Sequence, residues 1–371
     1  MKPGIPISNI GPGILAQREA LEAAISAVLA SGVFINGPEV EAFEREMASY
    51  LGVRHCVGVN SGTDALSIGL RALGIHSGDE VIVPSFGFIA TSEAVAAVGA
   101  IPVFVDIDEQ TFNLDPAELR AALTPRTRAI IGVHLFGQAA SMEEIMAVAL
   151  EHGLLVLEDV AQALGGAFRQ RKLGSLGHAA ALSFFPSKNL GAFGDAGLLA
   201  TNDADVADVS RQLRQHGGKD KYRSEQTGYN SRLDAIQAAV LRVKLPHLDA
   251  NVARRRQAAD RYDRLLGGAR GLQLPWRDPA ATHTFHQYTL RIAAGQRDGV
   301  RQALLAQGIQ AMVYYPTPLH QQPVYGERSR GLVLARAEEA SASVLSLPIW
   351  PEIEAADQER VAAAVCEALV D

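Results

Sequence analysis

The chain has 371 residues with a formal net charge of −7, and 48% of the residues are hydrophobic and 20% are charged. A chain of this length is too long for one simple core, so we expect two domains. The composition is typical of a globular protein, and a negative net charge without a basic block argues against nucleic acid or an anionic membrane as the main partner.

Cysteine content and the first residues bear on the compartment. Cys56 and Cys366 are the two cysteines, and they offer no disulfide framework. Residues 1–10 lack the basic start and the apolar centre of a signal peptide. The longest apolar run, residues 94–105, is too short to span a bilayer and is interrupted by glycine and proline. We therefore expect a cytoplasmic protein.

Strand and helix patterns alternate along the first two thirds of the chain. After an extended arm at residues 1–12, we predict helices at 13–31 and 39–51. Such alternation predicts an α/β fold with a mostly parallel seven-stranded sheet covered by helices. The predicted strands are 55–59, 80–84, 102–106, 129–134, 154–159, 179–185 and 197–201, and the predicted helices between or after them are 63–73, 92–98, 116–123, 142–152 and 205–216.

The last third of the chain is predicted to form a smaller α/β unit. Residues 233–266 predict a long helix with a kink at Pro246. Beyond it we predict strands at 285–292 and 310–315 and helices at 298–307 and 355–370. We therefore divide the chain into an N-terminal arm (1–12), a large domain (13–245) and a small C-terminal domain (246–371).

The stretch that best indicates chemistry is residues 179–197. An apolar strand stops at Pro186, and Lys188 follows in a glycine-rich turn. A lysine at the edge of the core loses its proton readily, because low dielectric disfavours the ammonium form. A neutral amine is the nucleophile that forms an imine. The alternative is a solvated loop lysine, which for an isolated lysine is the better interpretation.

Polar residues also follow other predicted strands, at the edge where open parallel sheets bind ligands. Ser61, Gly62 and Thr63 begin a helix, so they are placed to hold a phosphate, or merely to cap the helix, with Asp64 closing a capping box. Asp159 ends a buried strand and needs a cationic partner, either a protonated pyridine nitrogen or a salt bridge.

Three further side chains each have a functional and a structural interpretation. Gln162 either bonds a ring substituent or caps its loop. Phe88 either stacks on a flat ring or packs in the core. Ser183 bonds either a phosphate or the backbone. Together with Lys188 and Asp159, they describe a pyridoxal-phosphate pocket.

Five blocks of the sequence resemble the DegT/DnrJ/EryC1/StrS sugar aminotransferases, which are fold-type I, aspartate-aminotransferase-like enzymes. The similarity runs over nearly the whole chain and the blocks occur in the same order. The blocks are residues 61–66 (SGTDAL), 84–90 (PSFGFIA), 158–162 (EDVAQ), 183–191 (SFFPSKNLG) and 228–237 (GYNSRLDAIQ).

The resemblance implies roles in binding pyridoxal 5'-phosphate. Lys188 would hold the cofactor covalently and then move a proton between cofactor and substrate carbon. Asp159 would keep the ring nitrogen protonated, Phe88 would stack on the ring, and Gln162 would lie near the ring hydroxyl. Leu164 stands where many relatives carry a histidine, which removes a polar neighbour of the cofactor.

The resemblance also implies a phosphate site shared between subunits. Gly62, Thr63 and Ser183 would bind the phosphate, and Asn230 would reach it from a neighbouring subunit, which makes the active unit a homodimer. Asn230 also suits a simple turn, because it follows Gly-Tyr.

The family's usual substrates are a keto sugar on a nucleoside diphosphate and glutamate as amino donor. Candidate partners for the diphosphate are cationic side chains. The alternative is that these side chains are only solvated surface charges. These are Lys219, Lys221, Arg223 and Arg232, and Tyr315 and His320 are the candidates beside the sugar.

Residues 134–138 and 217–222 resemble members that act on 3-keto sugars more than members that act on 4-keto sugars. The alternatives are a 4-keto-sugar aminotransferase and a cofactor-binding regulatory relative without turnover. A nucleotide-binding oxidoreductase is disfavoured, because no Gly-x-Gly-x-x-Gly motif follows a strand. His283 and His286 are three residues apart, but on a strand they would face opposite sides, so we expect no metal there.

Overall fold

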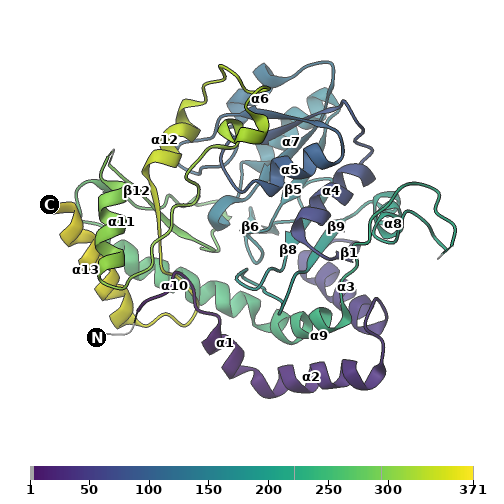
Figure 1. The fold of residues 1–371 in the computed structure, drawn as a ribbon, viewed down its shortest axis with the longest axis horizontal. Coiled ribbons are helices and arrows are strands. Elements are labelled where there is room, and N and C mark those ends of the chain that lie inside the picture. Colours follow the sequence, from purple (N-terminus) through teal and green to yellow (C-terminus); the bar gives the residue numbers. More distant parts are fainter. Residues whose placement is uncertain (1–3, 221, 294, 371) are drawn as a thin grey trace.

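The computed structural model describes residues 4–220, 222–293 and 295–370 (Figure 1). At the majority of their ends, the predicted helices and strands agree with the observed ones within three residues, and the exceptions are given below. Within these ranges, no helix combines the length and the apolar character that crossing a membrane requires.

Seven strands form the central sheet: β1 (His55–Val59), β2 (Glu80–Pro84), β3 (Ile101–Val105), β4 (Thr127–Val133), β5 (Leu155–Asp159), β8 (Ala179–Ser183) and β9 (Gly197–Thr201). Their order is β1-β9-β8-β5-β4-β2-β3. Neighbours from β8 to β3 pair in parallel, whereas β9 runs antiparallel to both β1 and β8. The predicted mostly parallel seven-stranded sheet is confirmed.

Both faces of the sheet are apolar, because successive strand residues point to opposite sides. Val57 and Ile131 belong to one buried cluster, and their chain neighbours Cys56 and Ile130 belong to the other. The first cluster includes helices α4 (Gly62–Ala72), α5 (Ala90–Ala97) and α8 (Ala204–Leu213). The second includes α3 (Pro38–Leu51), α6 (Pro116–Ala122), α7 (Met142–His152) and α9 (Ala235–Lys244).

The N-terminal segment lies along the outside of this unit (Figure 1). One helix was predicted over 13–31, but Gln17 separates α1 (Gly11–Ala16) from α2 (Arg18–Ser31). The predicted arm begins in residues 1–3, which lie outside the described residues. Ile5 is buried and forms a bridge with Ile309 near the end of the chain.

The long helix predicted at 233–266 is interrupted at Pro246. There α9 gives way to the 3-10 turn η2 (Leu245–His247) and then to α10 (Leu248–Leu266), because proline lacks the amide hydrogen that a continuous helix uses. The domain boundary predicted at 245/246 falls in this turn, and the division into domains stays a prediction.

A second, antiparallel sheet follows: β10 (Leu272–Gln273), β12 (Tyr288–Ile292) and β13 (Val344–Leu347). Residues of α10, α11 (Arg297–Ala306) and α13 (Ala355–Val370) form its buried cluster. These elements lie together on one side of the molecule (Figure 1).

Two predicted strands are wrong in whole or in part. Residues 310–315 form no strand, and Met312 alone bridges to Ser346. The strand predicted from residue 285 begins at Tyr288, because the backbone of residues 284 and 287 bonds to the loop at 136–137 instead. Elements that the sequence did not predict are β6 (Ala167–Phe168), β7 (Arg171–Lys172), β10, β11 (Ala281–Thr282), α12 (Ala335–Ser343), β13 and the 3-10 turns η1 (Leu135–Gly137), η3 (Leu319–Gln321) and η4 (Pro323–Tyr325).

Candidate active site

A cavity of about 390 Å³ opens at the carboxyl edge of the central sheet. It is bordered by residues at or after the ends of β1, β2, β4, β5 and β8 and by residues just before β9. Because β9 runs opposite to its neighbours, its beginning lies where the other strands end. This is the edge at which open α/β sheets bind ligands.

The cavity brings together most of the predicted site residues. Those that border it are Gly62, Thr63, Phe88, Asp159, Gln162, Ser183, Lys188 and Tyr315. Their proximity is a feature of the structure, whereas the role of each stays a prediction.

Lys188 lies in a tight turn after β8. Its amide donates to the carbonyl of Phe185 at 2.8 Å. Glycine is required at position 191, because a Cβ there would overlap the carbonyl of Pro186. Lys188 Nζ makes no hydrogen bond to a described residue, and burial lowers the pKa of Lys188 to about 8, although the charge of Asp159 acts in the opposite direction. The neutral, nucleophilic amine is therefore far more populated than in a solvated lysine.

Asp159 ends β5, and 7% of the residue is exposed. Its Oδ2 accepts a hydrogen bond from Thr91 Oγ1 at 2.9 Å, and its Oδ1 accepts one from the amide of Ala161 at 3.1 Å. No salt bridge to Asp159 forms within the described parts of the chain, contrary to one interpretation of the sequence. A buried carboxylate without a paired cation is costly, and a protonated ring nitrogen would supply that cation.

The N-terminus of α4 and the end of β8 form another wall. Ser61 Oγ accepts from the amide of Asp64 at 3.1 Å, so Ser61 caps the helix, while Asp64 makes no reciprocal bond to it among the described residues. Gly62 lets the helix approach the strand, because a Cβ on Gly62 would lie 2.6 Å from the Cβ of Ser183. Thr63 and Ser183 add hydroxyl groups at this positive helix end, where a phosphate binds favourably.

Aromatic and amide side chains form a further part of the cavity wall. Phe88 is 57% exposed, and its ring centroid is 6.1 Å from that of Tyr315. Gln162 Nε2 donates to the hydroxyl of Tyr315 at 2.8 Å, and Gln162 Oε1 accepts from the amide of Phe136 at 2.7 Å. The oxygen and the nitrogen of the Gln162 amide are thus both hydrogen-bonded within the wall. The exposed face of Phe88 is available for stacking. Leu164 is buried and does not border the cavity among the described residues.

Five predicted residues do not border the cavity of their own chain. Asn230, Lys219 and Arg223 are exposed, and Arg232 is partly buried elsewhere. His320 is buried, with Nε2 3.2 Å from Glu338 Oε1, and does not border the cavity, so the prediction that it lies beside the sugar lacks support in the structure. Lys221 lies outside the described residues.

Sequence patterns missed several residues of the cavity wall. They are Thr91, Asp195, His286, Gln287 and Tyr314. Three of them, His286, Gln287 and Tyr314, come from the C-terminal unit, whose Gln287 amide donates to the carbonyl of Phe136 at 3.2 Å. A contact between residues so far apart in the chain has no local sequence signal. In the described part of the chain, no three histidine, cysteine, aspartate or glutamate side chains gather as a metal site would require.

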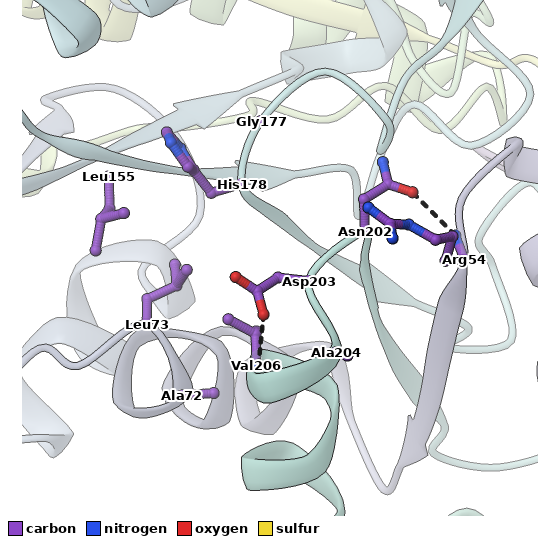
Figure 2. Close-up of a pocket in the computed structure, with 10 residues that line it drawn as sticks. All are labelled: Arg54, Ala72, Leu73, Leu155, Gly177, His178, Asn202, Asp203, Ala204 and Val206. Atoms are coloured by element: carbon purple, nitrogen blue, oxygen red, sulfur yellow. Dashed lines mark hydrogen bonds between the residues drawn. The ribbon is translucent and has the colours of Figure 1, made fainter.

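A second cavity of about 600 Å³ lies at the opposite edge of the sheet (Figure 2). Its polar side chains serve the local turns. Asn202 Oδ1 accepts from the amide of Arg54 at 3.0 Å, and Asp203 Oδ1 accepts from the amide of Val206 at 3.3 Å. His178 Nδ1 accepts a backbone amide at 3.0 Å. This larger cavity therefore lacks the uncommitted reactive groups of the cavity around Lys188.

The groups around Lys188 fit pyridoxal 5'-phosphate. Among the residues that the structure describes, an amine without a partner, a buried carboxylate without a paired cation, an open aromatic face and a helix N-terminus beside two hydroxyl groups border one cavity. These are the protein contributions that this cofactor needs. The fold and the site together define a pyridoxal-phosphate-dependent transferase of the α/β class.

Comparisons with known proteins give the family. The sequence model of the DegT/DnrJ/EryC1/StrS aminotransferase family matches residues 16–366. The chain is 47% identical to the "Pleiotropic regulatory protein" of Geobacillus stearothermophilus, over 92% of each chain. It is 45% identical to the dTDP-3-amino-3,4,6-trideoxy-alpha-D-glucose transaminase of Streptomyces venezuelae, over 98% of this chain and 96% of that relative.

A solved structure agrees closely in fold. The X-ray structure of S. venezuelae DesV in complex with a ketimine intermediate has a TM-score of 0.96 and 45% sequence identity, and the match covers 99% of this chain and 98% of that chain. The chain belongs to the DegT/DnrJ/EryC1/StrS aminotransferase family. Its cofactor is pyridoxal 5'-phosphate, as in the other aminotransferases of this family.

Proposed function

We propose that the protein transfers an amino group from glutamate to C3 of a keto sugar carried on a nucleoside diphosphate. The observation that carries this proposal is the unpartnered amine of Lys188 in the same cavity as the buried carboxylate of Asp159. When bound, the cofactor supplies an electron sink.

The chain's own residues divide the work. Lys188 holds the cofactor and, as a free amine, moves a proton to or from the substrate carbon. Asp159 keeps a positive charge on the ring nitrogen, and Thr91 and Ala161 hold the Asp159 carboxylate in place through hydrogen bonds of 2.9 and 3.1 Å. Phe88 covers one side of the cavity.

Amination at C3 is supported by a relative and by two segments of the chain. The S. venezuelae relative, with 45% identity, is named as a transaminase of a 3-amino sugar. Residues 134–138 and 217–222 resemble members that act on 3-keto sugars. Two alternatives to amination at C3 remain for an assay to distinguish. One is amination at C4, and the other is cofactor binding without turnover, as the name of the G. stearothermophilus relative suggests.

We further propose a homodimer whose subunits complete each other's sites. Phe34 and Ile35 are neighbouring apolar residues that are both more than one third exposed, which indicates a surface that another chain covers. Asn230 is exposed and bridges to Gln215, whose side chain bonds Asn36 Nδ2 at 3.3 Å, so it lies beside this surface.

The partner subunit would also supply positive charge. Lys188 is the one lysine or arginine that borders the cavity among the described residues. A diphosphate and the carboxylates of glutamate need more cations than that. We propose that Lys219 and Arg232 act, as Asn230 does, on the site of the other subunit.

The two cysteines are free thiols, as expected in a reducing compartment. We therefore propose a cytoplasmic location.

The test uses the cofactor's own colour. Purified protein should be yellow, borohydride should bleach it, and glutamate should shift its spectrum, whereas K188A should show none of these responses. Incubation with glutamate and 3-keto or 4-keto nucleotide sugars should then give amination of the 3-keto sugars. Amination of 4-keto sugars alone would contradict the C3 assignment.

A further inference from the structure

His286 borders the cavity around Lys188, and its ring has no hydrogen-bond partner in the described part of the chain. The residue is 8% exposed, and its Nδ1 is buried and unpartnered. Its Nε2 also makes no hydrogen bond to a described residue. Buried polar groups are nearly always hydrogen-bonded, so this ring lacks a partner that a ligand would provide.

The other buried histidines among the described residues, His134, His283 and His320, each bond through at least one ring nitrogen. In His134, Nε2 lies 3.1 Å from Glu158 Oε2, and Nδ1 accepts from the amide of Ala140 at 3.0 Å. His283 Nδ1 accepts from the amide of Phe285 at 2.9 Å. These two rings serve the fold, whereas the ring of His286 is uncommitted.

The backbone around His286 is held firmly against the large sheet. The amide of Thr284 donates to the carbonyl of Gly137 at 2.9 Å, and the amide of Gln287 donates to that of Phe136 at 3.2 Å. A Cβ on Gly137 would lie 3.1 Å from the amide nitrogen of His286. The position of the ring at the cavity is therefore fixed by the fold before any ligand binds.

The charges that act on the pKa of His286 are positive. Burial lowers the pKa of His286 well below its ordinary value, and the charges of Lys188 and Arg255 lower it further. The imidazole is therefore neutral at physiological pH. A neutral ring is a poor partner for a carboxylate, but it both donates to and accepts from a hydroxyl group.

We propose that His286 hydrogen-bonds a hydroxyl group of the pyranose ring of the keto sugar and so selects the sugar, but not the amino donor. This rests on the proposed function. Residues that would hold the cofactor phosphate and ring nitrogen lie on the walls formed by α4, β5 and β8, while His286, like Tyr314 and Tyr315, borders the cavity from the C-terminal unit. The sugar would bind between this segment and Lys188.

The two half-reactions separate the proposal from a general catalytic role. In H286F, which keeps a ring but no hydrogen bond, kcat/KM for the 3-keto sugar should drop about tenfold, as expected for the loss of one hydrogen bond to an uncharged group. The single-turnover rate with glutamate should change by less than about twofold. The matched control is H283F, a buried histidine of the same segment outside this cavity, which should keep both rates within about twofold.

Deoxy sugars identify the group that His286 contacts. The substrates are nucleoside-diphosphate 3-keto sugars that each lack one hydroxyl group. For one of these analogues, kcat/KM of the wild-type protein should be about tenfold lower than for the full sugar, whereas kcat/KM of H286F should be the same for both. The dissociation constant of the amino-sugar product, measured by calorimetry on the cofactor-free protein, should rise by a similar factor in H286F.

Three outcomes would overturn the inference. In the first, H286F slows both half-reactions equally. In the second, each deoxy analogue lowers kcat/KM by the same factor in the wild-type protein and in H286F. In the third, the dissociation constant of the amino-sugar product is the same in both proteins. A wild-type protein that fails to react with glutamate or with any 3-keto sugar would be seen before any variant is compared, and that result would overturn the proposed function itself.

Discussion

The hydroxyl of Thr91 donates a hydrogen bond of 2.9 Å to Asp159 Oδ2 at the base of the cavity. This bond connects the first turn of α5 with the end of β5, two elements that are 68 residues apart in the chain. With the amide of Ala161 on Oδ1, it fixes the plane of the carboxylate. Thr91 is therefore a positioning residue that acts through Asp159.

T91V tests this relationship, because valine keeps the shape and removes the donor. A hydrogen bond to a charged group contributes about 1.5–3 kcal/mol, so we expect both half-reactions to slow by roughly 10- to 100-fold. The visible spectrum of the bound cofactor should also change its pH dependence. The neighbouring S92A, which removes a hydroxyl that bonds the carbonyl of Ile89, should leave the spectrum unchanged. An unchanged spectrum in T91V would contradict the positioning role.

The pKa of Lys188 predicts how the cofactor-free protein takes up pyridoxal phosphate. Burial lowers this pKa to about 8, and only the neutral amine attacks the aldehyde. The rate of uptake should therefore rise with pH through about 8 and level off above it. Since the charge of Asp159 raises the pKa of Lys188, D159N should move this midpoint to lower pH. Stopped-flow absorbance measures both, and a midpoint near that of an ordinary lysine would refute the prediction.

Gly62 should be intolerant of substitution. The Cβ added in G62A would lie 2.6 Å from the Cβ of Ser183, so the start of α4 must move away from β8. We expect the dissociation constant of the cofactor to rise at least about tenfold, because the phosphate loses its helix N-terminus. G299A is the matched control in the first turn of α11, where an added Cβ meets nothing within 4 Å. It should leave cofactor affinity unchanged and stabilise the fold by about 0.5–1 kcal/mol.

Hybrid dimers test whether the sites are shared. Homodimers of either variant should have low activity. K188A removes the covalent attachment of the cofactor, and N230A removes the contact that the partner makes with the cofactor phosphate. If the subunits reassort at random, half of the dimers are hybrids with one intact site, so mixing should restore about one quarter of wild-type activity. Titration of one variant with the other measures this. No recovery on mixing would show that Asn230 serves its own chain or neither.

The sequence predicted the central sheet well because its strands are buried on both faces. Runs such as residues 80–84 and 179–183 are almost entirely apolar, so burial alone marks them. Prediction failed where pairing depends on distant segments. Residues 310–315 have a strand-like composition, but Met312 alone finds a partner in Ser346.

The same distinction applies to the site. Lys188, Asp159 and Gly62 lie next to strong local signals, namely a strand end, a proline and a helix start. Thr91 and His286 carry no such signal, because their importance arises from contacts with segments far away in the chain. Asn230 could be assigned a role only through the resemblance, since in its own chain it does not border the cavity.

The bonds that tie residues 284 and 287 to the loop at 136–137 have a consequence for biosynthesis. During synthesis, the ribosome delivers Lys188 and Asp159 well before the segment that carries His286. A nascent chain that ends near residue 245 would already contain the reactive amine, but one side of its chamber would be open to water. The enzyme therefore closes its reaction chamber only when the last third of the polypeptide has folded onto the first.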